Sequence, residues 1–155
     1  MLIMPATIAL IALALAGCAA QPASPPGLGD PTAASAAPAV ADLARTDVQG
    51  AVEFVATPLN LTALGGTLDF YVSMNTHSTD LGWDLAAQST LRTDTGVEVA
   101  GETWPVGSGH HYDGTLSFPA TTADGRALLD GAATLTLTIR DTDVAERVFT
   151  WELGQ

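Results

Sequence analysis

Alternation of apolar and polar side chains over residues 67–76 is the feature that most constrains the fold. Every second residue from Leu68 to Met74 is apolar, and the residues between them are polar or, in one case, tyrosine. Successive side chains of a strand point to opposite faces, so the pattern predicts a strand with one face on a core and the other in solvent. The apolar members are Leu68, Phe70, Val72 and Met74.

Similar β-forming segments follow one another to the end of the chain. The predicted strands are residues 48–58, 67–76, 83–92, 97–104, 112–118, 133–140 and 147–153. The segment 83–92 is the least regular and also fits a helical turn. Glycine-containing turn sequences separate the strands, and no segment has the pattern of a long amphipathic helix. We therefore expect an all-β fold, a single antiparallel β-sandwich that is immunoglobulin-like with about seven strands, although the Cys…Trp…Cys spacing of true immunoglobulin domains is absent.

The N-terminal residues have a different character. The apolar run Ile8 to Ala16 is too short for a membrane-spanning helix and has the length of the apolar part of a signal peptide. It ends in Leu15-Ala16-Gly17-Cys18, which resembles the lipobox of bacterial lipoproteins. The resemblance implies that residues 1–17 are a signal peptide removed by cleavage, and that Cys18 carries a diacylglyceryl group and an acylated amino terminus, with palmitate as a typical chain. The first five residues lack the usual lysine or arginine, so either translation starts upstream of Met1 or the terminal amine supplies the charge.

Composition divides the remaining chain into two parts. Residues 18–45 are rich in alanine, proline, serine and glycine, which predicts a flexible linker, and residues 46–155 contain the predicted strands. Ala19 gives no signal for retention in the inner membrane of a Gram-negative cell. We expect the periplasmic side of the outer membrane in such a cell, and otherwise the outer face of the cytoplasmic membrane.

The net charge of −12 limits the partners. All five basic residues are arginine, and a chain this acidic lacks the cationic surface that nucleic acids require. It also lacks a basic patch for anionic lipids, so the lipid on Cys18 is the expected route to the membrane. The charge favours attraction of cations.

Catalytic motifs are not convincing in this chain. Asp94-Thr95-Gly96 matches the triplet of aspartic proteases, but such enzymes need two aspartates that share a proton, and the sequence contains no second copy. Between two predicted strands the triplet is a turn sequence. We therefore expect a protein that is not an enzyme.

A strand count brings the three histidines together. In an up-and-down arrangement successive loops alternate between the two ends of the sandwich, so His77, the loop at 105–111 with His110 and His111, and the loop at 141–145 share one end. His110 and His111 would point to opposite faces if the strand has already begun, which leaves one of them to meet His77.

Two interpretations of these histidines remain open. Each ring could bond to its own loop, or the three could form a Zn²⁺ or Cu²⁺ site in which Asp80 and Asp113 orient the rings by hydrogen bonds. Met74 is either a thioether ligand or part of the core. Trp83 and Trp104 are either core anchors or an exposed platform for sugar or peptide.

These observations predict a cell-envelope lipoprotein that presents a small, non-catalytic β-sandwich as a binding or interaction module, with no required cofactor. The alternative is an extracytoplasmic Zn²⁺- or Cu²⁺-binding protein that uses His77, His110 and His111. The expected partners are the membrane, through the lipid on Cys18, and an envelope protein or a metal ion.

Replacing Cys18 with serine tests the lipoprotein assignment. Serine offers no thiol for lipid transfer, so we expect the Cys18→Ser chain to remain at precursor size and to incorporate no labelled palmitate. Gel mobility and metabolic labelling measure the two properties. A Cys18→Ser chain that still runs at mature size with label incorporated contradicts the assignment.

Overall fold

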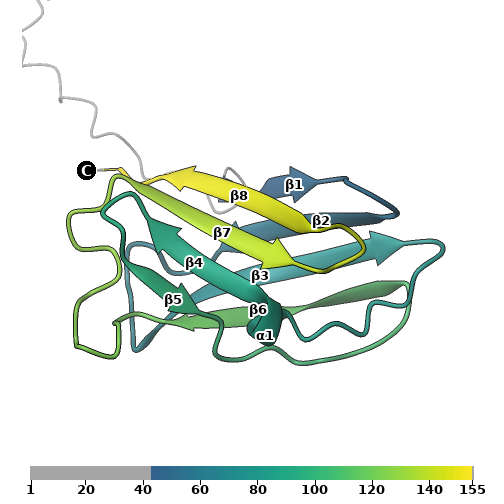
Figure 1. The fold of residues 1–155 in the computed structure, drawn as a ribbon, viewed down its shortest axis with the longest axis horizontal. Coiled ribbons are helices and arrows are strands. Elements are labelled where there is room, and N and C mark those ends of the chain that lie inside the picture. The colour runs from purple at the N-terminus through teal and green to yellow at the C-terminus, as the bar shows by residue number, and fades with distance from the viewer. Residues whose placement is uncertain (1–42, 155) are drawn as a thin grey trace, which may run out of the picture. The chain divides into compact units, whose positions relative to one another are not determined.

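The computed structural model describes residues 43–154, which form two antiparallel four-stranded sheets packed face to face (Figure 1). The all-β sandwich predicted from the sequence is confirmed. Cys18, the predicted signal peptide and the predicted linker up to residue 42 lie outside the described residues. The first sheet contains, in spatial order, β1 (Arg45–Asp47), β2 (Val52–Pro58), β3 (Thr67–Thr76) and β6 (His111–Pro119). The second contains β5 (Glu98–Ala100), β4 (Ser89–Thr93), β7 (Thr134–Arg140) and β8 (Glu146–Glu152).

The strand order agrees with the predicted immunoglobulin-like sandwich when the short edge strand β1 is set apart. The seven strands β2 to β8 form the order β2-β3-β6 in one sheet and β5-β4-β7-β8 in the other. Named A, B, C, C′, E, F and G in chain order, they give A-B-E in one sheet and C′-C-F-G in the other, which is the arrangement of immunoglobulin-type sandwiches.

Alternating side chains form the core between the sheets. Leu68, Phe70, Val72 and Met74 of β3 are all fully buried, as the period-two pattern predicts. Phe70 meets Trp151 of β8 with ring centroids 5.2 Å apart, and this contact joins the two sheets. Because Met74 lies inside the core, its thioether is not available to a site in a loop.

The segment 83–92 is a strand only in its second half. The helix α1 (Leu85–Gln88) comes first, and β4 follows it directly. Asp84 caps α1, since its carboxylate accepts hydrogen bonds from the backbone amides of Ala86 and Ala87. The helical turn considered from the sequence is thus confirmed, and the single strand over 83–92 is wrong. Among residues 43–154, no helix has the length and apolar character needed to cross a membrane.

The segment 97–104 is also shorter in β-structure than predicted. After β5 the chain leaves the second sheet, and Glu102 N donates to Ser117 O of β6 at 2.9 Å. Between β4 and β5, residues Asp94-Thr95-Gly96 form the predicted turn, in which Gly96 has a φ of 83°. The Asp94 carboxylate accepts bonds from two backbone amides of the next hairpin, those of Ala133 and Thr134.

The start of the described chain is attached to the last strand. Trp151 Nε1 donates to Leu43 O at 2.6 Å, and Arg45 Nε donates to Thr150 O at 3.1 Å. The sequence placed the start of the folded domain at Thr46. In the structure the contacts of the domain already include Leu43 and Arg45.

A buried arginine joins the two sheets at one end. Arg147 of β8 is 0% exposed, and its guanidinium lies over the Phe54 ring at 4.3 Å from the centroid. It forms an ion pair with Asp47 at the end of β1. The same group donates to Gln49 O at 2.9 Å and to Thr142 O at 3.2 Å. Burying a charge is costly unless it is paired and hydrogen-bonded, and these contacts supply both.

The carboxyl group of Asp47 responds to this environment. Burial alone would raise its pKa, but hydrogen bonds from Gln49 and the charge of Arg147 outweigh burial and hold the pKa below its ordinary value. A carboxyl with a lowered folded-state pKa stabilises the fold above its unfolded pKa of about 3.9. That stabilisation is lost as the pH falls through the folded-state pKa.

We expect Asp47→Ala to reduce the free energy of unfolding by about 3–5 kcal/mol at pH 7, because it leaves the buried guanidinium without its counter-charge. Urea denaturation of the purified protein measures the change. Asp130→Ala removes an exposed carboxylate and should change stability by no more than about 0.5 kcal/mol. The difference between wild type and Asp47→Ala should shrink below about pH 4. Equal effects of the two substitutions would contradict the assigned role of the ion pair.

Candidate functional site

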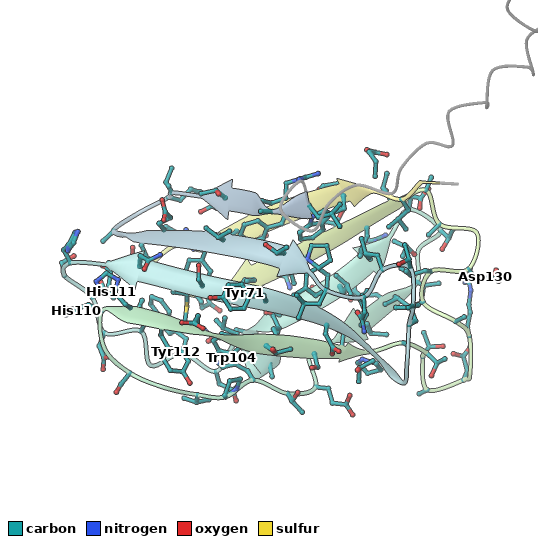
Figure 2. The ribbon with its side chains drawn as sticks, turned by 180° about the vertical axis from the view of Figure 1, so that it is seen from behind. Tyr71, Trp104, His110, His111, Tyr112 and Asp130 are labelled. Carbon is teal, nitrogen blue, oxygen red and sulfur yellow. The ribbon has the colours of Figure 1, made fainter. Side chains whose placement is uncertain are left out.

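The two ends of the sandwich differ in what they carry. The histidine end consists of the loops at residues 48–51, 77–84, 105–110 and 141–145. The Leu43 end contains Leu43, where the described chain begins, and the loops at 59–66, 94–97 and 120–133. Figure 2 shows His110 and His111 at one extreme of the domain and Asp130 at the other.

His77 and His111 meet at the histidine end. Their ring centroids are 6.3 Å apart, and the ring planes are nearly perpendicular, at 84°. The contact arises because β6 pairs antiparallel with β3, so that His111 lies opposite Asn75, two residues before His77. The prediction that His77 shares an end with at least one of the other two histidines is confirmed.

His110 has a different role from His111. Its backbone carbonyl accepts a hydrogen bond from Thr76 N at 2.9 Å, which continues the pairing of β3 with β6 by one residue. Its side chain is exposed. The structure therefore brings together two of the three candidate histidine rings.

The ring of His111 is oriented by Asn75. His111 Nδ1 lies 2.9 Å from Asn75 Oδ1, across the two paired strands. Within the described part of the chain, this amide takes the place that the sequence interpretation gave to Asp80 or Asp113. The sequence carried no signal for Asn75, because a polar residue on the solvent face of a strand is ordinary.

A shallow cleft of about 300 Å³ lies beside His77. One wall is the stretch Val48 to Glu53, and the other is Asn75 to His77. Glu53 lies opposite Asn75 in the pairing of β2 with β3. Glu53, Asn75 and His111 therefore form one row across the outer face of the first sheet. Glu53 and its part in the cleft were not predicted from the sequence.

Acidic side chains hold the loops around this cleft. Asp143 Oδ2 accepts a hydrogen bond from Ala51 N at 2.6 Å, which ties the 141–145 loop to the start of β2. This confirms that the 141–145 loop shares the end with the histidines. Gly50 has a φ of 65°, and a Cβ at this position would overlap the Asp143 carboxylate. Glycine is therefore needed there for both its backbone angle and its lack of a side chain.

Asp80 and Tyr112 hold the neighbouring loops. Asp80 Oδ1 accepts a bond from Gly109 N at 2.8 Å, and Leu81 N donates to Gly109 O at 3.0 Å. The hydroxyl of Tyr112 donates to Pro105 O. A Cβ at Gly107 would overlap the Tyr112 ring, so glycine allows the 105–110 loop to lie flat on that ring. These contacts give the histidine end a defined shape.

Asp113 lies further along the outer face of the first sheet, where it interacts with Tyr71. Desolvation raises the pKa of the Tyr71 hydroxyl, and the charge and hydrogen bond of Asp113 raise it further. Tyr71 is 40% exposed on this face. Asp113 thus orients a tyrosine.

Both tryptophans in question serve the core. Trp104 is 8% exposed and meets Tyr112 edge-on at 5.9 Å between ring centroids. Trp83 stacks on Phe54 at 6.2 Å. Figure 2 shows Trp104 next to Tyr112 of β6. Of the two sequence interpretations, the core role is the one these contacts support.

Over residues 43–154, no three His, Cys, Asp or Glu side chains lie close enough to hold one metal ion together. The three-histidine arrangement considered from the sequence is therefore reduced to the pair His77 and His111. Comparison of the chain with models of known protein families, with curated proteins and with solved structures found no match.

We expect Asp80→Ala to loosen the 105–110 loop without unfolding the domain, because it removes a charged acceptor from the Gly109 amide. Hydrogen exchange at that amide, followed by NMR, should become about tenfold faster or more. Asp113→Ala is the matched control, since Asp113 lies on a strand and should leave Gly109 unchanged. A Gly109 amide that exchanges equally fast in wild type and Asp80→Ala would show that this bond does not hold the loop.

Proposed function

We propose that this protein is a lipid-anchored component of the cell envelope and that its β-sandwich is a non-catalytic binding module. One observation carries the proposal: Leu43, which precedes the first strand, is bonded to Trp151 at the end of the sandwich opposite the histidines. A chain attached to a membrane through Cys18 would therefore be joined to the domain at the Leu43 end. The histidine end would then be the end that is free to meet a partner.

The loops of the histidine end support a role in binding. Asp80, Asp143 and Tyr112 each bond to a backbone group of a neighbouring segment. Loops that are already ordered lose less conformational entropy when they bind, and more of the contact energy then remains as affinity. The cleft of about 300 Å³ beside His77 adds a concave surface at the same end.

The hydrogen bonds of the Asp80 and Asp143 carboxylates favour binding over catalysis. Asp80 and Asp143 accept hydrogen bonds from backbone amides, so both carboxylates act in holding the loops. The partner we propose is another protein of the cell envelope. With a net charge of −12, the chain favours a partner with a neutral or basic contact surface over a nucleic acid.

The proposed location follows from the lipid anchor. Two or three acyl chains on Cys18 would hold the protein stably at a membrane, since one chain alone binds only marginally. We place it on the periplasmic side of the outer membrane in a Gram-negative cell, and on the outer face of the cytoplasmic membrane otherwise.

Site-specific photo-crosslinking in living cells tests which end meets the partner. A photoreactive amino acid at Ser78 or Ser108 probes the histidine end, and the same amino acid at Ala63 or Ala123 probes the Leu43 end as a matched control. All four positions are exposed. We expect discrete crosslinked products from Ser78 and Ser108 and not from the two control positions. Crosslinks of equal yield at both ends, or at the Leu43 end alone, would overturn the proposal.

A further inference from the structure

We propose that His77 and His111 form a two-ligand site for a transition-metal ion that prefers imidazole, with Cu²⁺ bound more tightly than Zn²⁺. The site uses two rings and solvent, and it excludes His110. It lies on side chains of the folded domain, so it does not depend on the lipid anchor or on the partner proposed above.

The positions of the two rings suit one shared ion. Two nitrogens bound to one ion at about 2.0–2.1 Å each lie at most about 4 Å apart. The ring centroids of His77 and His111 are 6.3 Å apart in an edge arrangement. Both side chains are exposed, and exposed side chains change rotamer within nanoseconds. The proposed site therefore requires the exposed His77 side chain to turn until one of its nitrogens comes within that distance of His111 Nε2.

Asn75 prepares His111 for this role. When Nδ1 of a neutral imidazole donates to an amide oxygen, Nε2 keeps its lone pair and is the atom available to a metal. His111 Nδ1 lies 2.9 Å from Asn75 Oδ1. Metal-bound histidines in proteins nearly always have such a partner on their other nitrogen, because it selects the tautomer and holds the ring.

The backbone under His111 belongs to the sheet. Asn75 and His111 are directly paired residues of β3 and β6, and Thr76 N donates to His110 O next to them. His77 follows β3 by one residue. The sheet therefore fixes the position of His111 and the starting point of the loop that carries His77, and a sheet holds a ligand more accurately than a loop does.

The surrounding charge is favourable to a cation. Glu53 and His77 line the same cleft, and Asp113 lies two residues beyond His111 on the same exposed face.

Two imidazoles with water in the remaining positions fit the tetragonal geometry of Cu²⁺, and Cu²⁺ exceeds Zn²⁺ in the usual order of affinities. Ca²⁺ and Mg²⁺ prefer oxygen ligands and should not compete. A site with two protein ligands holds an ion that exchanges, which suits capture or transfer of a metal better than a structural role.

Isothermal titration calorimetry of the full-length Cys18→Ser chain in mild detergent tests the site, because this chain has no thiol to compete for the ion. We expect CuCl₂ to bind with a stoichiometry of one. His77→Ala and His111→Ala should each weaken binding by tenfold or more, and Asn75→Ala by about tenfold. A hundredfold excess of CaCl₂ or MgCl₂ should leave the titration unchanged.

His110→Ala is the matched control, since it removes a histidine next to the site whose ring takes no part in it. It should leave the affinity for Cu²⁺ within about twofold of wild type, and sub-stoichiometric Cu²⁺ should broaden the NMR signals of the His77 and His111 rings before those of His110. Thermal melting without metal checks that each variant is folded. Absence of Cu²⁺ binding, or equal loss of affinity in the His110→Ala and His77→Ala chains, would overturn the proposal.

Discussion

The buried ion pair between Arg147 and Asp47 is the contact on which the histidine end depends. Arg147 belongs to the second sheet, and its partners Asp47, Gln49 and Phe54 belong to the first sheet or to the loop after β1. A guanidinium without exposure must be paired, because an uncompensated charge in the core would cost several kcal/mol. The need to pair the Arg147 guanidinium determines the path of the chain at residues 47–49. That passage continues directly into the wall of the cleft at Val48 to Glu53.

The position of the first strand also gives the domain a direction. β1 runs beside β2 toward Asp47, and β8 holds its beginning through Trp151 and Leu43. Leu43 and the loops of the histidine end therefore lie at opposite ends of the sandwich, separated by the length of its strands (Figure 1). A domain built in this way can be attached at one end and can bind at the other. The proposed partner and the proposed metal ion both bind at the histidine end.

Much of the fold could be predicted because the core strands alternate cleanly. β3 and β7 lie within one residue of the segments predicted from alternation, and their apolar residues are buried. The segment 83–92 was harder, since Asp84 caps a helical turn before β4 begins. The strand count that placed the histidines together assumed a single strand there. The histidines nevertheless meet, because the direct pairing of Asn75 with His111 in β3 and β6 decides the matter.

The sequence by itself determined the layers of this protein, and the tertiary structure decided its site. Period-two alternation depends on local geometry, since successive side chains of a strand point to opposite faces and the apolar ones lie on the face that is buried. The same local rule has no information on which distant residues become neighbours. Asn75 beside His111, Glu53 in the cleft and Asp47 under Arg147 are polar residues with ordinary positions in the sequence. They acquire their roles only through strand pairing and sheet packing, which join segments as much as 108 residues apart because apolar burial holds the two sheets together.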